Sequence, residues 1–155
     1  MPTDEETVER AHKDAEEGKS PSTQAGEFVR QEIEHVREGE HGARSTKQAI
    51  AIGLSKARRA GVKLPPPKSA RTSAQTRHKA QLDLEKAKQK RKPSRKRSRA
   101  IKAALKREGK AAASTRALSR QARSAAKGRS REERSQAAQK AAVTRASGRR
   151  KRREE

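Results

Sequence analysis

Large apolar side chains are scarce in this sequence. Its 155 residues include one Phe and no Trp or Tyr, and only 28% are hydrophobic against 39% charged. Much of the hydrophobic fraction is Ala, which favours helix but removes little apolar area from water. Most of the chain therefore lacks the apolar burial that offsets the entropy cost of ordering. The composition predicts a mostly α-helical and largely disordered chain with no large core.

Missing residue types and motifs exclude several kinds of site. There is no Cys, which excludes disulfides and thiolate metal sites and favours a reducing cytoplasm. No run of 18 apolar residues predicts a membrane span, and the acidic start is unlike a signal peptide. Gly-x-Ser-x-Gly, His-Glu-x-x-His and glycine-rich phosphate loops are absent. We therefore expect no enzyme, no cofactor and no membrane partner.

Charge is abundant and unevenly placed. The formal net charge is +23, yet residues 1–42 hold 12 acidic against 5 basic residues, whereas residues 43–155 hold 7 against 37. Self-repulsion of this size is relieved by a polyanion, and nucleic acid is the expected partner. We predict an acidic N-terminal arm over residues 1–21.

The strongest helix signals lie before the proline run at residues 65–67. Acidic residues and a Thr3–Glu6 capping box predict a helix over 4–17 that ends near Gly18. A second helix is expected over 23–38, with Gly39 as its left-handed cap.

The segment Ser-Thr-Lys-Gln-Ala-Ile-Ala-Ile-Gly-Leu-Ser-Lys-Ala, which begins at Ser45, has the fullest set of signals. Ser45 is a predicted N-cap with Gln48 as its capping-box partner, and Gly61 follows the helix end. Val62 is placed to pack back onto Ala57, as in a Schellman motif. We predict a helical hairpin over residues 22–67, closed by a stiff proline spacer. Its expected core consists of Phe28, Ile33, Val36, Ile50, Ile52 and Leu54.

This Lys-Gln-Ala-Ile-Ala-Ile helix, preceded by a helix that ends in Arg-Glu-Gly-Glu, resembles the hallmark of an uncharacterised family of small basic bacterial proteins. The resemblance covers about residues 29–62. It implies a bacterial source and supplies no catalytic residues.

Residues 68–155 form a basic tail with 31 Lys or Arg and 7 acidic residues. Gly109, Gly128 and Gly148 recur at intervals of about twenty residues, and each ends an Ala-rich basic segment that begins at a Ser. Ser130 with Glu133 is a further capping box. Isolated helices of this length are marginal in water, so we expect disorder in the free chain and helix formation on binding. The tail is similar in composition to linker-histone-like bacterial tails.

Basic clusters in the tail are the predicted phosphate contacts. Lys and Arg neutralise phosphates and release counterions without reading sequence, and the tail has no aromatic on which unpaired bases could stack. We therefore predict non-specific duplex DNA binding and compaction by a nucleoid-associated protein. The predicted contacts are Lys90, Arg91, Lys92, Arg95, Lys96, Arg97, Arg99, Arg129, Arg131, Arg134, Arg149, Arg150, Lys151, Arg152 and Arg153.

Other interpretations remain open at this stage. The basic tail also suits an RNA- or ribosome-associated protein. The hairpin would suit a protein-interaction module, with its apolar face forming a homodimer. The acidic residues 1–42 would either fold back on the tail and compete with DNA or serve as a solubilising arm.

Histidine offers one further possibility. Glu32 with His35 and Glu38 with His41 are Glu-x-x-His pairs, a spacing that builds di-metal sites in helix bundles. Such sites need an enclosed core, so we interpret the four His as solvated and predict no metal site.

Overall fold

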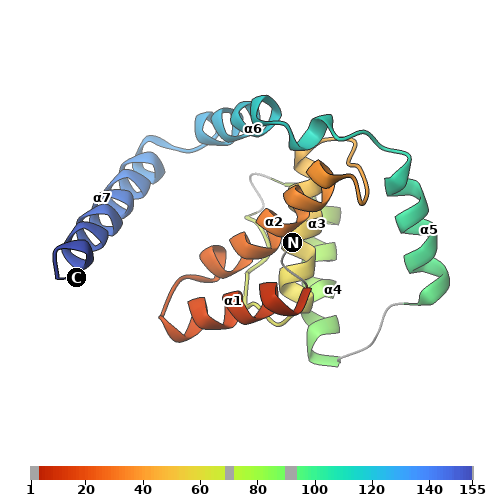
Figure 1. Cartoon of the computed structure of the whole chain (residues 1–155), viewed down its shortest axis with the longest axis horizontal. Coiled ribbons are helices and arrows are strands. Elements are labelled where there is room, and N and C mark those ends of the chain that lie inside the picture. Colours follow the sequence, from red (N-terminus) through yellow and green to blue (C-terminus); the bar gives the residue numbers. More distant parts are fainter. Residues whose placement is uncertain (1–3, 69–71, 90–93, 155) are drawn as a thin grey trace. The chain divides into compact units, whose positions relative to one another are not determined.

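The computed structural model describes residues 4–68, 72–89 and 94–154, and the regular structure within them is helical (Figure 1). The elements in chain order are α1 (Asp4–Glu16), α2 (Pro21–Glu38), α3 (Thr46–Arg59), α4 (Ala74–Gln89), α5 (Arg95–Lys106), a short 3-10 helix η2 (Ala111–Ala113), α6 (Thr115–Lys127) and α7 (Arg131–Glu154). The contacts between residues divide the chain into two compact units, residues 1–118 and residues 119–155, and the boundary falls within α6. The proline run at which we predicted the hairpin to end lies inside the first unit.

Glycines end the first three helices as the sequence predicts. Gly18, Gly39 and Gly61 have φ of 70°, 86° and 101°, in the left-handed region that favours glycine. The N–H of Gly39 donates to the carbonyl of His35, which satisfies a carbonyl at the end of α2. The predicted cap at Thr3 lies outside the described residues.

The start and end of α3 also follow their sequence signals. The Ser45 hydroxyl accepts a hydrogen bond from the N–H of Gln48 at 3.2 Å. The Gln48 side chain reaches back to the N–H of Arg44, one residue earlier than in a standard capping box. The N–H of Val62 donates to the carbonyl of Ala57, and the two side chains share one apolar cluster. The Schellman contact is confirmed.

Small residues allow α2 and α3 to pack closely. Ala49 and Ala57 are fully buried, and they lie one helical turn to either side of Gly53. A Cβ on Gly53 would lie 2.7 Å from the Cα of Val29, so the backbones meet with no side chain between them. We expected Ile50 and Leu54 in the core, but the fully buried positions of α3 are the smaller Ala49 and Ala57. Short side chains thus allow close packing of α2 and α3 in a chain that has few large apolar side chains.

The residues that we expected to form the hairpin core divide into two sets. Phe28, Ile33 and Val36 of α2 are buried, whereas Ile50, Ile52 and Leu54 of α3 are half-buried. Phe28 packs in a cluster with residues of α1 and α3, and Ile33 and Val36 pack with η2. A second chain is therefore not needed to cover these α2 side chains.

Helix α1 packs against α2 (Figure 1). Ala11 is buried in the cluster that also contains Ala25 and Phe28. The Gln31 amide donates to the carboxylate of Asp4 at 3.0 Å, which ties the start of α1 to the middle of α2. The acidic N-terminal segment is therefore a packed part of the fold.

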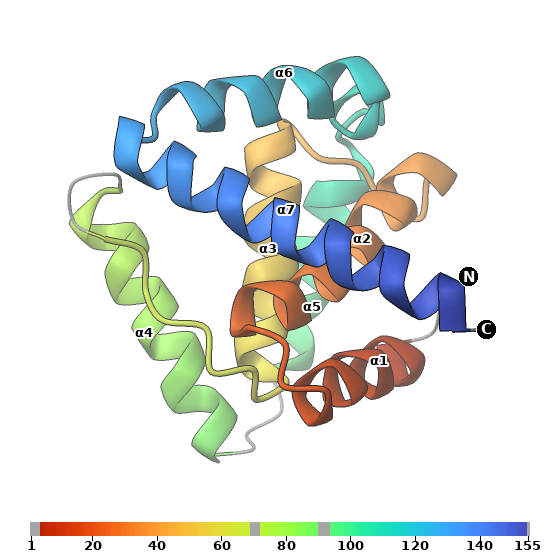
Figure 2. The same cartoon turned by 90° about the vertical axis from the view of Figure 1, so that its left-hand side faces the viewer.

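Helix α4 packs against α3, although it lies beyond the prolines (Figure 2). The Ser55 hydroxyl donates to the carboxylate of Asp83, and the Arg59 guanidinium lies 3.3 Å from the same carboxylate. Arg58 of α3 donates to the carbonyls of Leu64 and Pro65, which fixes the chain as it leaves the helix. Burial lowers the pKa of the Arg58 guanidinium below its ordinary value.

The segment that follows α5 docks on the connection between α2 and α3. The N–H of Gly42 donates to the carbonyl of Leu105 at 2.9 Å, and the N–H of Ala43 donates to the carbonyl of Gly109 at 3.1 Å. The Thr46 hydroxyl donates to the carbonyl of Ala112 at 2.6 Å. These bonds join parts of the chain more than sixty residues apart.

The buried side of this docked segment extends the core. Ala112 and Ala113 are buried in one cluster with Ile33 and Val36. The Arg37 guanidinium also donates to the carbonyl of Ala113 at 3.0 Å. Ala thus contributes burial that the composition did not suggest, because it allows close approach of two backbones.

The prediction of a largely disordered chain without a core is wrong. The tail contains formed helices, and α4 and η2 pack on the first three helices. The physical reason is that helices rich in Ala, Lys and Arg have high propensity, and tertiary contacts here supply the remaining stability. The predicted break at Gly148 is wrong too, since α7 continues through it.

Substituting Gly53 tests the α2–α3 contact. Gly53→Ala should destabilise the fold by roughly 1–3 kcal/mol, because the new methyl group forces the backbones apart. Gly26→Ala is the control, since its Cβ would meet nothing within 4 Å, and it should gain up to about 1 kcal/mol of helix propensity. Urea unfolding followed by circular dichroism measures both. Equal effects of the two substitutions would contradict the close contact.

Gly42→Ala tests the docked segment in the same way. Its Cβ would lie 1.9 Å from the Glu108 carbonyl oxygen, so docking and the substitution are incompatible. We expect faster hydrogen exchange at the Ala43 amide, measured by NMR, while Gly109→Ala, whose Cβ has free space, leaves that rate near the wild-type value. An unchanged rate in Gly42→Ala would show that residues 105–113 do not dock here.

Candidate nucleic-acid interface

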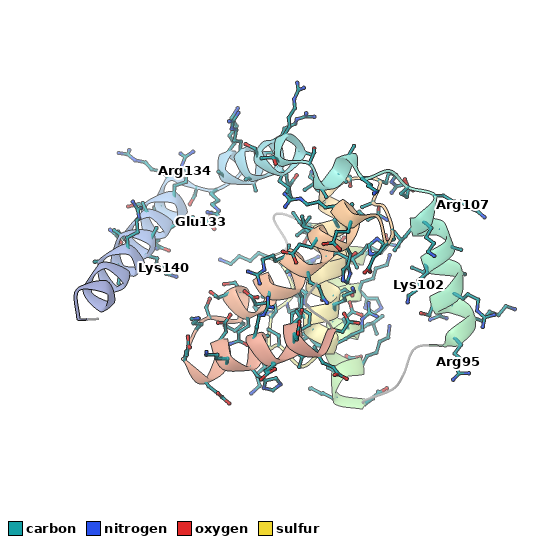
Figure 3. The ribbon with its side chains drawn as sticks, in the orientation of Figure 1. Arg95, Lys102, Arg107, Glu133, Arg134 and Lys140 are labelled. Carbon is teal, nitrogen blue, oxygen red and sulfur yellow. The ribbon has the colours of Figure 1, made fainter. Side chains whose placement is uncertain are left out.

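Helix α5 carries a row of cations along one face. Arg95, Arg99, Lys102 and Lys106 follow the spacing i, i+4, i+7 and i+11, which places them within about 60° of one another around the helix axis. All four are exposed. Ile101, on another side of the helix, is 53% exposed. We call these four residues the α5 stripe, and Figure 3 labels Arg95 and Lys102 within it.

Helix α6 repeats the same arrangement. Arg116, Arg120, Arg123 and Lys127 have the same four-residue spacing and are exposed. We call them the α6 stripe. Ser114 caps the helix, because its hydroxyl accepts a hydrogen bond from the N–H of Ala117 at 3.3 Å. A cap without a carboxylate keeps the first turn of α6 free of acidic charge.

Helix α7 starts at the predicted capping box. The N–H of Glu133 donates to the Ser130 hydroxyl, and the N–H of Ser130 donates to the Glu133 carboxylate at 3.0 Å. Arg131 and Arg134 are exposed on the first turns, where Figure 3 labels Arg134 next to Glu133. The box therefore fixes the start of a helix whose cations are less regularly placed than those of α5 and α6.

The remaining predicted phosphate contacts are spread over three places. Lys96 and Arg97 are exposed on α5 outside its stripe, and Arg129 is exposed between α6 and α7. The cluster at 149–153 lies on the helical backbone of α7, where we expected a flexible segment. Lys90, Arg91 and Lys92 lie outside the described residues.

Sequence reasoning missed six of the eight members of the two stripes. We selected runs of adjacent cations, and a run points its side chains all around a helix. The missed residues are spaced by three or four positions instead. This spacing of three or four positions is visible in the sequence and indicates cations on one face of a helix. The missed residues are Lys102, Lys106, Arg116, Arg120, Arg123 and Lys127.

The two stripes keep their charge available. Helices α5 and α6 contain no Asp or Glu. In the part of the chain that the structure describes, no ion pair reaches either stripe. Within α1 and α2, Glu27 pairs with Arg10 and Arg30, and Glu34 pairs with Arg30. The net positive charge of the chain is thus concentrated where no carboxylate neutralises it.

A buried carboxylate marks a different kind of site at the end of α2. Glu32 is fully buried, with the Nζ of Lys56 2.9 Å from its Oε2 and the Nε2 of His41 3.3 Å from its Oε1. His35 also reaches this group, and the ligand atoms of Glu32, His35 and His41 lie within 4.8 Å of one another. The interpretation of these two His as solvated side chains is wrong. Glu38, which we had paired with His41, is exposed.

Comparison with known families matches residues 5–68 to DUF6496, a family of unknown function. This region spans α1 to α3 and the prolines, and it is less than half of the chain. Neither curated proteins nor solved structures gave a match. None of the helices in the described residues has the length and apolarity to cross a bilayer.

Proposed function

We propose that this protein binds duplex DNA without sequence preference and acts as a nucleoid-associated, DNA-compacting protein. The observation that carries the proposal is the repeated i, i+4, i+7, i+11 row of exposed cations on α5 and α6. Such rows place several guanidinium and ammonium groups along a line, where they contact successive phosphates and release counterions.

The size of a stripe fits this mode of binding. Eleven helical steps of 1.5 Å extend each stripe over about 16 Å, which is several times the 3.4 Å rise between phosphates along one strand. Contacts of this kind fix position on the backbone and carry no base information. Because α5 and α6 lack aromatic residues, the stripes offer nothing on which unpaired bases would stack.

The acidic helices complete the division of charge. Asp14 and Glu17 hold Lys19 in exposed ion pairs at 2.7 Å, and these pairs lower the pKa of Glu17 and raise that of Lys19. Helices α1 and α2 pack against each other, and the loop after α2 holds residues 105–113 through backbone hydrogen bonds. We therefore favour a scaffold role for residues 1–42 over competition with DNA. Deleting them removes both helices and cannot test charge alone.

Charge removal on α5 tests the proposal. The variant with Arg95, Arg99, Lys102 and Lys106 all changed to Gln should bind a labelled DNA duplex more weakly, and the slope of log affinity against log salt should fall by up to about 3.6, at 0.9 per lost phosphate contact. Fluorescence anisotropy over a salt series measures both quantities.

The matched control removes four exposed cations from the first 68 residues. Changing Lys13, Arg44, Lys47 and Lys63 to Gln alters the net charge by the same amount, and all four are exposed. The slope should then change little. If both variants lose the same slope, binding follows net charge and the stripe has no special role. If a structured RNA displaces the labelled duplex from the protein, RNA is the preferred ligand and the proposal of DNA binding is wrong.

A further inference from the structure

We propose that Glu32, His35 and His41 form a binding site for a divalent transition metal ion of the zinc class. The three residues bring one carboxylate and two imidazoles together at the end of α2, and their ligand atoms lie within 4.8 Å of one another. Imidazole nitrogen and carboxylate oxygen are preferred Zn²⁺ ligands. Glu32 and His35 are one helical turn apart, and His41 comes from the loop after the Gly39 cap.

The distance between the Glu32 and His41 ligand atoms fits a tetrahedral ion. Two ligand atoms at about 2.0–2.1 Å from a tetrahedral Zn²⁺ are about 3.3 Å apart. The Oε1 of Glu32 and the Nε2 of His41 are separated by 3.3 Å. The other ring nitrogen of His41, Nδ1, lies 3.1 Å from the Gly42 carbonyl oxygen. If Nδ1 carries the proton it donates to this oxygen, and Nε2 then offers its lone pair to the ion.

The Glu32 carboxylate lacks the hydrogen bonds expected of a buried anion. The residue has no exposed surface, and neither oxygen accepts a hydrogen bond from the described groups. Lys56 lies 2.9 Å from one oxygen, at an ion-pairing distance but without hydrogen-bond alignment. Burying a carboxylate in this state is costly, and a bound cation would compensate it.

Other charged groups around the site set the coordination and the affinity. The carboxylate of Glu40 lies 3.8 Å from the Nδ1 of His35, close enough to supply a fourth oxygen after a side-chain rotation. Lys56 is the opposing cation and weakens metal binding by repulsion. The two carboxylates of Glu32 and Glu40 exceed the single positive charge of Lys56, and this negative excess attracts a divalent ion more strongly than a monovalent one.

The bound ion would stabilise the loop between α2 and α3, on which residues 105–113 dock. Loop residues Gly42 and Ala43, next to His41, donate to the carbonyls of Leu105 and Gly109. Fixing His41 to the end of α2 therefore also fixes the surface on which residues 105–113 dock. The metal site itself uses no residue of the stripes that we propose to bind DNA.

Titration of the untagged full-length chain with Co²⁺ tests the site, because tetrahedral Co²⁺ absorbs visible light and Zn²⁺ displaces it. We expect one equivalent to bind and the spectrum to disappear on addition of Zn²⁺. His35→Gln and His41→Gln should each weaken binding by more than about 100-fold, the upper limit for loss of a second-shell partner. His12→Gln and His78→Gln, which change exposed His elsewhere, should bind as the wild type does.

Lys56→Gln gives the complementary test, because it keeps all three ligands. Removing a unit charge near the ion should tighten Co²⁺ binding by roughly tenfold or more. Circular dichroism confirms that each variant is folded. Absence of saturable binding in the wild type, equal loss in the His12 and His41 variants, or unchanged or weaker affinity in Lys56→Gln would each overturn the proposal.

Discussion

The close contact between α2 and α3 is the constraint on which the rest of the first unit depends. Gly53 lets the α3 backbone come against Val29 without a side chain between them. This approach holds α2 and α3 in a fixed pair, and the loop between them presents the N–H groups of Gly42 and Ala43. The segment after α5 binds those groups and adds two alanines to the core. A chain with one aromatic residue therefore forms a core by bringing backbones together, because dispersion and hydrogen bonds at short range replace the area that large side chains bury elsewhere.

In this arrangement the packed scaffold is distinct from the stripes that we propose to bind DNA. Among the described residues, ion pairs join α1 to α2, α2 to α3 and α3 to α4. Helices α5 and α6 carry cations without acids. A scaffold that anchors α5 would reduce the ordering entropy that a disordered tail would lose in the proposed binding to DNA. The docked residues 105–113 are the physical link between the scaffold and the end of α5.

Local signals in the sequence predicted the helix ends well. Gly39, Gly61 and the Ser130–Glu133 box act where they were expected, because caps depend on neighbours within one turn. The contact face of α3 was less predictable. Periodicity favours the larger Ile50 and Leu54, whereas the closeness of α2 is a tertiary property that selects Gly53. Docking of residues 105–113 could not be predicted, since it joins backbone groups far apart in sequence and leaves no side-chain signature.

The candidate sites show the same division. The stripes follow from helical periodicity, and a search by spacing would have found them where a search for adjacent cations did not. The cluster at Glu32 was visible only in part, because the sequence showed the Glu32–His35 spacing but not that His41 folds back onto Glu32 across the loop. Its burial also depends on α3, which places Lys56 against the carboxylate.

Acetylation footprinting of the full chain with and without duplex DNA tests the central claim most directly, namely that a scaffold presents cations on α5 and α6 to phosphates. Mass spectrometry reports the reactivity of each lysine. We predict that DNA protects Lys102, Lys106 and Lys127 and leaves Lys13 and Lys47 as reactive as in the free protein. Equal protection at all five lysines, or protection confined to Lys13 and Lys47, would contradict the account.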